Sequence, residues 1–135
     1  MTAGYYLKLY FATLVAFFAL DLAWVGVIAR PLYQNYLGFL LASNINWVVV
    51  ALFYLLFSIG LLVFVIIPGQ QSGSLHNTLV LAAFFGLVTY ATYDLINLAT
   101  IKDWPVFVTL IDMAWGALLS TLVCYISFTV GRWLK

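Results

Sequence analysis

Four long and almost uncharged apolar stretches constrain this chain more than any other feature of its sequence. They cover about residues 5–29, 46–67, 77–101 and 105–131. A helix needs about 20 consecutive apolar residues to cross the hydrocarbon core of a bilayer, and each stretch is long enough. The sequence therefore predicts an all-α integral membrane protein, a four-helix bundle that forms a single transmembrane domain over residues 1–135.

The charged residues are too few to cover a water-soluble domain. They make up 7% of the 135 residues, while hydrophobic residues make up 67%. Soluble domains carry about 25% charged residues, so the lipid bilayer is the expected surroundings. A net charge of +1 provides no basic stripe, and no nucleic-acid partner is expected. The single cysteine, Cys124, excludes an internal disulfide.

Helix-breaking residues separate the four stretches. The pair Arg30-Pro31 is expected to end the first, because proline disfavours the helical conformation in the residue before it. The pair Pro68-Gly69 is expected to end the second, and Asp103 is a suitable N-cap for the fourth. The first stretch is longer than the apolar region of a signal peptide, so we expect it to be retained as a span.

The connection after the first span has a helical pattern of its own. Over residues 31–42, apolar side chains recur every three or four positions, with polar ones opposite. This pattern is typical of a short amphipathic helix in the interface plane. An ordinary loop resting on the bundle is the alternative. The residues on the apolar side are Leu32, Tyr33, Tyr36, Leu37, Leu40 and Leu41.

Three aspartates are predicted at one depth inside the membrane. Asp21 lies nine residues before Arg30, and Asp112 lies seven residues after Pro105. Asp94 lies a similar distance from the end of the third span, so each is roughly 10–14 Å inside its helix end. Because the fourth span runs opposite to the first and third, all three fall in the half of the membrane that is remote from the termini. Ionisable residues at such depth are usually functional or paired.

Polar and aromatic residues on the same helical faces are expected to converge on these aspartates. Three carboxylates in a low-dielectric layer cannot all stay ionised without compensation, so we expect a proton on at least one, or a cation among them. Neutral aspartates that simply link the helices by hydrogen bonds are the alternative. The candidate ligand-binding residues are Asp21, Asp94, Asp112, Asn97, Tyr54, Tyr90, Trp24 and Trp115.

Neither a metal site nor a catalytic site can be assigned from the sequence. The usual metal-binding pair of acids, three or four residues apart on one helix, is absent, and the cofactor stays open. The only histidine, His76, lies in a polar loop on the opposite side from the aspartates, so no Ser/His/Asp arrangement is available.

A stripe of small residues runs along the first span, on the side opposite Asp21. Small residues at this spacing favour close packing between membrane helices. We therefore expect this helix to have neighbours on two sides, either centrally in the fold or through a second copy or a larger partner. The candidate interface residues are Ala12, Ala16, Ala19, Ala23 and Gly26.

Three phrases of the chain resemble a known family. They are ALDLAWVGVIARPLY, YATYDLINLATIKDWP and VTLIDMAWG, which surround the three aspartates. The chain is similar over nearly its whole length to small bacterial inner-membrane proteins catalogued as a domain of unknown function. The resemblance implies a four-span protein of the bacterial inner membrane and no established activity. The related tetrapeptides DLAW at 21–24 and DMAW at 112–115 also hint at an inverted repeat.

Three functions remain open from the sequence. The first is a binding or transport protein whose acidic, aromatic-lined pocket holds a cation, a protonated ligand or a proton. The second is an accessory subunit that docks a larger membrane partner through the first span. The third is a membrane enzyme acting on a lipid or an isoprenoid. Three cations on the terminal side against two on the other favour termini in the cytoplasm.

Overall fold

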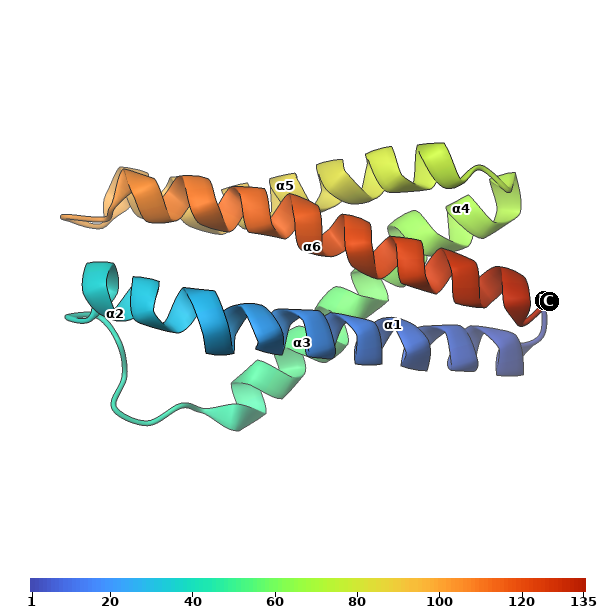
Figure 1. Ribbon diagram of the computed structural model, residues 1–135, viewed down its shortest axis with the longest axis horizontal. Coiled ribbons are helices and arrows are strands. Elements are labelled where there is room, and N and C mark those ends of the chain that lie inside the picture. Colours follow the sequence, from blue (N-terminus) through green and yellow to red (C-terminus); the bar gives the residue numbers. More distant parts are fainter.

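The computed structural model describes residues Met1–Lys135, and every regular element in it is a helix (Figure 1). Four helices are long and apolar enough to cross a membrane. The predicted all-α class with four spans is confirmed. In chain order the elements are α1 (Ala3–Trp24), η1 (Val25–Ala29), α2 (Arg30–Leu37), α3 (Trp47–Leu61), η2 (Leu62–Ile66), α4 (Ile67–Ser72), α5 (Leu75–Thr100) and α6 (Val106–Trp133).

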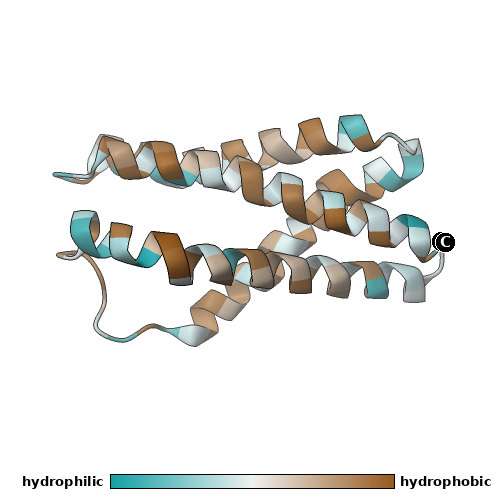
Figure 2. Ribbon diagram, viewed as in Figure 1, coloured by the Kyte–Doolittle hydropathy of each residue, from teal (hydrophilic) through white to brown (hydrophobic).

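The helix α6 is the centre of the bundle, because it packs against both α5 and α1. The helix α3 packs on α1 and crosses it obliquely in Figure 1. The same view places the chain termini and the α4–α5 turn at one end of the molecule, and α2 and the α5–α6 turn at the other. Hydrophobic residues run along the helices, and hydrophilic ones gather at the two ends (Figure 2).

Polar side chains fix where three of the helices begin. Thr2, Asn46 and Ser74 each accept a hydrogen bond from the backbone N–H three residues later, at 3.2–3.3 Å. Such N-caps satisfy one of the amide groups that the first turn of a helix leaves without a partner. Only Gly73 and Ser74 separate the end of α4 from the start of α5.

The structure differs from the sequence-based expectation at two prolines. Neither Pro31 nor Pro68 ends its helix, which instead continues to Leu37 and to Ser72. A single π-helical turn, η1 or η2, precedes each proline. A proline ring collides with the carbonyl group four residues earlier, and a widened turn relieves that collision. The segment expected as a separate helix over 31–42 is therefore helical over Arg30–Leu37 and continuous with the first span.

Apolar side chains cover the outside of the bundle, and several polar ones are buried inside it. Leu7, Val27 and Trp47 are 65–75% exposed, which suits a surface that faces lipid. Inside, the hydroxyl groups of Thr13 on α1 and Ser127 on α6 lie 2.9 Å apart. Hydroxyl contacts of this kind are common between membrane helices, where no water competes for them.

Candidate functional site

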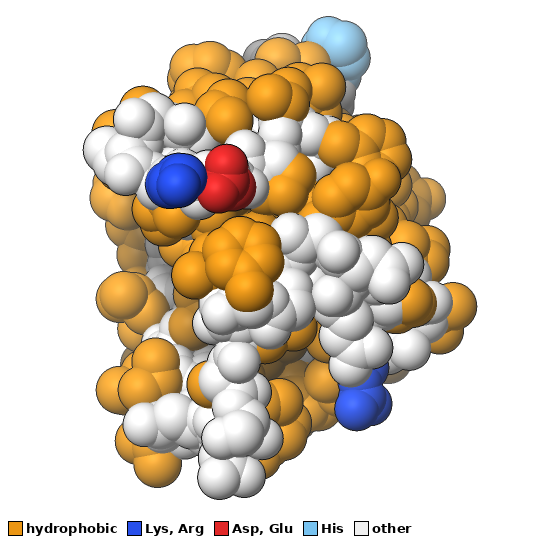
Figure 3. All heavy atoms as spheres, turned by 90° about the vertical axis from the view of Figure 1, so that its left-hand side faces the viewer, with side chains coloured by type: hydrophobic (Ala, Val, Ile, Leu, Met, Phe, Trp, Pro, Cys, Tyr) orange, Lys and Arg blue, Asp and Glu red, His pale blue; other side chains and the backbone are white.

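Three helices each bury one carboxyl group in the half of the bundle remote from the termini. Asp21 on α1 is 8% exposed, Asp94 on α5 is fully buried, and Asp112 on α6 is 6% exposed. We call these three groups the acidic layer. The end of the molecule that lies nearest to it shows mainly hydrophobic and uncharged atoms, with a small acidic area, a basic area beside it and a separate basic area (Figure 3). The three carboxyl groups themselves are buried between the helices.

Asp21 is well supplied with hydrogen-bond donors. The Tyr54 hydroxyl on α3 donates to Oδ2 of Asp21 at 2.7 Å. The indole N–H of Trp115 on α6 donates to Oδ1 at 3.2 Å. Because both carboxylate oxygens are satisfied, Asp21 joins α1, α3 and α6 at the level of the acidic layer.

Asp112 has a donor that the sequence analysis did not assign to the site. The hydroxyl group of Tyr33, on α2, donates to Oδ1 of Asp112. The sequence places Tyr33 only on the apolar side of a short interfacial helix. The available signal was that this helix begins at the same end of the bundle as α6, which carries Asp112 near its start. Asp112 also interacts electrostatically with Asp21.

Asp94 is the unusual member of the acidic layer. Both of its carboxyl oxygens are buried, and neither has a hydrogen-bond donor. Its titratable neighbour is Asp112, which is itself an acceptor unless one of the two groups carries a proton. Burying an uncompensated carboxylate costs several kcal/mol, by an order-of-magnitude estimate. The Asp94–Asp112 pair therefore needs a shared proton or a cation.

Aromatic rings surround the acidic layer. Trp24 and Trp115 stack with their centroids 4.4 Å apart and their planes 7° apart. These are the tryptophans of the two related tetrapeptides, so the two phrases meet in space. Tyr90 on α5 interacts electrostatically with all three carboxyl groups. Asn97, the remaining candidate, is half-buried on α5, and no hydrogen bond joins it to a carboxyl group.

Two glycines bring α5 and α6 into close contact beside the acidic layer. A Cβ atom on Gly86 would overlap the backbone carbonyl group of Gly116. A Cβ atom on Gly116 would overlap the ring of Tyr90. Only glycine permits this approach, which is the usual reason for small residues between membrane helices. The crossing therefore sets the position of the Tyr90 ring.

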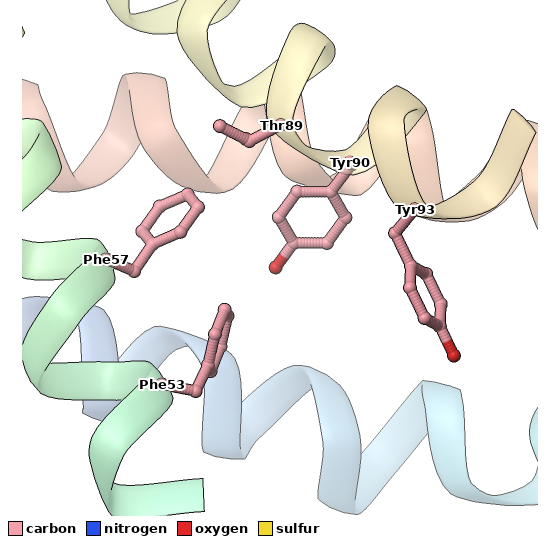
Figure 4. Close-up of a pocket in the computed structure, with 5 residues that line it drawn as sticks. All are labelled: Phe53, Phe57, Thr89, Tyr90 and Tyr93. Carbon is pink, nitrogen blue, oxygen red and sulfur yellow. The ribbon is translucent and has the colours of Figure 1, made fainter. Parts of the chain in front are cut away.

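A groove between α3 and α5 leads to Tyr90 from the outside of the bundle. Its volume is about 380 Å³, within the range of about 300–1,000 Å³ that is usual for ligand pockets. Figure 4 shows Phe53 and Phe57 on one side and Thr89, Tyr90 and Tyr93 on the other. The Tyr90 hydroxyl points into the space between the two helices, whereas Tyr93 points away from it. We call this space the α3–α5 groove.

The stripe of small residues on the first span is only partly covered. Ala16 is buried and Ala12 half-buried, but Ala19, Ala23 and Gly26 are exposed. A Cβ atom on Gly26 would meet no other atom within 4 Å. Within this chain, α1 therefore has close neighbours on the Asp21 side and along only the first part of the stripe.

Chemically, the arrangement of the acidic layer could accept a proton or a cation. No group of three or more His, Cys, Asp or Glu side chains is arranged to hold a metal ion. Tyrosine hydroxyl and indole N–H groups donate to Asp21 and Asp112, whereas no such group donates to Asp94. Aromatic faces next to carboxylates are also suited to an organic cation.

Comparisons with known proteins place the chain in a family. No curated protein matches it, and no solved structure matches it. A family described as "Predicted membrane protein (DUF2177)" matches residues 6–129, which is most of the chain and includes the whole acidic layer. The four apolar helices agree with that description. The protein is therefore a multi-pass membrane protein and belongs to the DUF2177 family of predicted membrane proteins.

Proposed function

We propose that this protein binds, or carries across the membrane, a cation, a protonated ligand or a proton at its acidic layer. One observation carries the proposal: Asp94 is fully buried, and its carboxyl oxygens have no donor apart from a proton shared with the adjacent carboxyl group of Asp112. Native proteins rarely bury a polar group without a partner, and such groups are often functional. A structural linker would instead be saturated with hydrogen bonds, as Asp21 is.

The charges around the layer also support a positively charged ligand. Asp94 and Asp112 are adjacent acceptors on neighbouring helices, and Asp21 interacts electrostatically with Asp112. All five Lys and Arg residues of the chain lie towards the ends of the spans, away from the buried carboxyl groups. A bound cation or proton would relieve the repulsion among the carboxylates.

The test compares Asp94→Asn with Asp103→Asn in purified protein. An amide at position 94 can donate to Asp112 and carries no charge, so we expect Asp94→Asn to raise the melting temperature without ligand. Sodium, methylammonium or a lower pH should stabilise the parent protein by binding to its folded form. Asp94→Asn should lose the response to the probe that binds.

Asp103 provides a matched control. It is exposed in the α5–α6 turn with a φ of 61°, a conformation that asparagine also adopts readily. Asp103→Asn should therefore respond to every probe as the parent does. If Asp94→Asn keeps the full response to all three probes, the acidic layer does not bind them and the proposal is wrong.

We also propose that the protein lies in a bacterial inner membrane with both termini in the cytoplasm. Lys8, Arg132 and Lys135 lie on the side of the termini, and Arg30 and Lys102 on the other. Cytoplasmic ends of membrane helices carry an excess of Lys and Arg, which supports this orientation.

A further inference from the structure

We infer that the ligand of the acidic layer is an amphiphile with one aliphatic tail and a basic head group, which enters sideways from the lipid through the α3–α5 groove. The inference rests on the proposed function, because it assumes that the carboxyl groups bind a positive charge. It adds the class of ligand and the route of entry. The groove and the unpaired Asp94 carboxyl group are two separate observations that point to one molecule.

The groove has the lining that an aliphatic tail requires. Four of its five residues are aromatic. The fifth, Thr89, donates its hydroxyl group to carbonyl oxygens of its own helix at 2.8 and 3.1 Å and so offers no free polar group to the groove. Phe53 is 43% exposed and Tyr93 is 61% exposed at the mouth. In a membrane, such a mouth faces acyl chains, so a lipid-like molecule can enter without crossing water.

Tyr90 joins the groove to the acidic layer. Its ring lines the groove and stands edge-to-face with Phe57, at a centroid distance of 6.2 Å. It also interacts electrostatically with Asp21, Asp94 and Asp112. A head group at the inner end of the groove would therefore meet the ring or hydroxyl group of Tyr90 and, beside it, the electrostatic field of the carboxyl groups.

Charge complementarity decides the nature of the head group. An ammonium group offers three N–H donors and no acceptor, which matches the two unpaired oxygens of Asp94 and the adjacent Asp112. Aromatic faces near carboxylates add cation–π attraction. An anionic head group would be repelled by the same three carboxyl groups, and a hydroxyl group would leave their charge uncompensated.

The oblique course of α3 explains why the groove exists. Trp47, Val48 and Val49, at the start of α3, are 58–71% exposed, whereas Tyr54, Ser58 and Leu61 are buried. The first part of this helix therefore stands away from the bundle, and only its later part joins the core. The space that this leaves beside α5 is the groove (Figure 4).

The test measures binding of dodecylamine, dodecanol and butylamine by native mass spectrometry and by thermal shift in detergent. Dodecylamine should bind once per chain and raise the melting temperature. Butylamine, which lacks most of the tail, should bind at least about tenfold more weakly, since each buried methylene contributes to affinity. Dodecanol, which enters detergent in the same way but carries no charge, should not shift the melting temperature.

Thr89→Phe fills the groove, and Thr92→Phe is its matched control. Both threonines bond only to carbonyl oxygens of their own helix, but Thr92 is exposed and does not line the groove. Thr89→Phe should weaken dodecylamine binding about tenfold and leave butylamine binding unchanged, because only the tail loses buried contact. Thr92→Phe should bind both as the parent does. Thr89→Leu replaces Thr89→Phe if the latter does not fold.

The outcomes separate this inference from the proposed function. If both amines bind with equal affinity through Asp94, or if the Thr89 variants bind dodecylamine normally, the groove does not hold the tail; the proposed function then stands without the inference. Equal stabilisation by dodecanol and dodecylamine would also overturn it, because the charge would not be recognised. If Asp94→Asn does not change the binding of either amine, the acidic layer does not bind amines, and both the proposed function for a cationic ligand and the inference about its tail are wrong.

Discussion

Tyr33 shows how one side chain ties a helix end to the acidic layer. It lies on α2, and its hydroxyl group donates to Asp112. No other tyrosine hydroxyl or indole N–H group donates to Asp112, whereas two such groups donate to Asp21. The free-energy cost of burying the Asp112 carboxyl group is therefore reduced by Tyr33 more than by any other hydroxyl group.

We expect Tyr33→Phe to lower the free energy of unfolding by about 1–2 kcal/mol, because it removes the donor and leaves a buried carboxyl oxygen unsatisfied. Tyr36→Phe is the control. Tyr36 lies on the same helix, is 43% exposed and contacts Phe107 through its ring. Unfolding titrations in mixed micelles measure both changes. Equal effects of the two substitutions would mean that the Tyr33 hydroxyl contributes nothing specific.

Counting residues along a span predicts the depth of a side chain, but it does not predict which groups the side chain contacts. Helical rise is nearly constant, so counting residues from the span ends brought Asp21, Asp94 and Asp112 to one level. Hydrogen bonds across helices depend on tilt and rotation, which counting does not give. For this reason the sequence groups Asn97 with the aspartates although no hydrogen bond joins it to them, and it does not predict the contact of Tyr33 with Asp112.

At the scale of whole helices, two prolines act through π turns. The sequence predicted helix ends at Pro31 and Pro68, since a proline inside an α-helix removes a hydrogen bond and causes a collision. The π turns η1 and η2 absorb this conflict, and the helices continue. The turn η1 follows directly on the segment that holds Asp21 and Trp24, and it sets the direction in which α2 presents Tyr33.

We expect Pro31→Ala to let η1 relax to a regular α-helix. A regular α-helical turn holds about one residue fewer than a π turn. The residues that follow, including those of α2, therefore rotate by about 100° about the helix axis, which takes Tyr33 away from Asp112. The stability lost should equal that of Tyr33→Phe, and the double variant should lose little more, because both changes remove one interaction. Double-mutant cycles in unfolding titrations provide the measurement.

Pro68→Ala serves as the control for that cycle. It follows the second π turn, η2, at the end of the bundle that is remote from the acidic layer. Its effect should add to that of Tyr33→Phe, since the two sites share no contact. If Pro31→Ala is also additive with Tyr33→Phe, η1 does not position Tyr33.

The faces of the helices could be predicted better than their crossing angles. On α3, Tyr54, Ser58 and Leu61 recur every three or four residues and are all buried, but Trp47, which falls at the same helical spacing, is 65% exposed. Periodicity identifies which side chains share a face, whereas the tilt of α3 away from the bundle depends on tertiary packing. The α3–α5 groove, which results from that tilt, had no signal in the sequence.

For the molecule as a whole, hydropathy settled the class of fold and the number of spans. Four apolar segments with so few charges leave a membrane bundle as the only reasonable solution, because every backbone group must be satisfied inside its own helix. The charged groups that remain follow two patterns. Most lie near the helix ends, and three carboxyl groups are buried between the helices.

The arrangement of the ends makes orientation testable with cysteine labelling. The termini and the α4–α5 turn lie at one end of the bundle, and the exposed residues 38–46 at the other (Figure 1). The native Cys124 is fully buried, so it should give little background. Because the cation excess is on the terminal side, that side should face the cytoplasm.

In intact bacterial cells, a membrane-impermeant maleimide should therefore label Asn44→Cys and should leave Gln71→Cys unlabelled until the membrane is permeabilised. Both positions are exposed and lie on opposite sides of the second span. Lys135→Cys is the control for the fold, because it should follow Gln71→Cys whichever way the protein is inserted. Labelling of Gln71→Cys and Lys135→Cys, but not of Asn44→Cys, in intact cells would reverse the orientation and place the acidic layer in the cytoplasmic half of the membrane. Equal labelling of Asn44→Cys and Gln71→Cys would contradict the passage of α3 and α4 through the bilayer, and with it the fold.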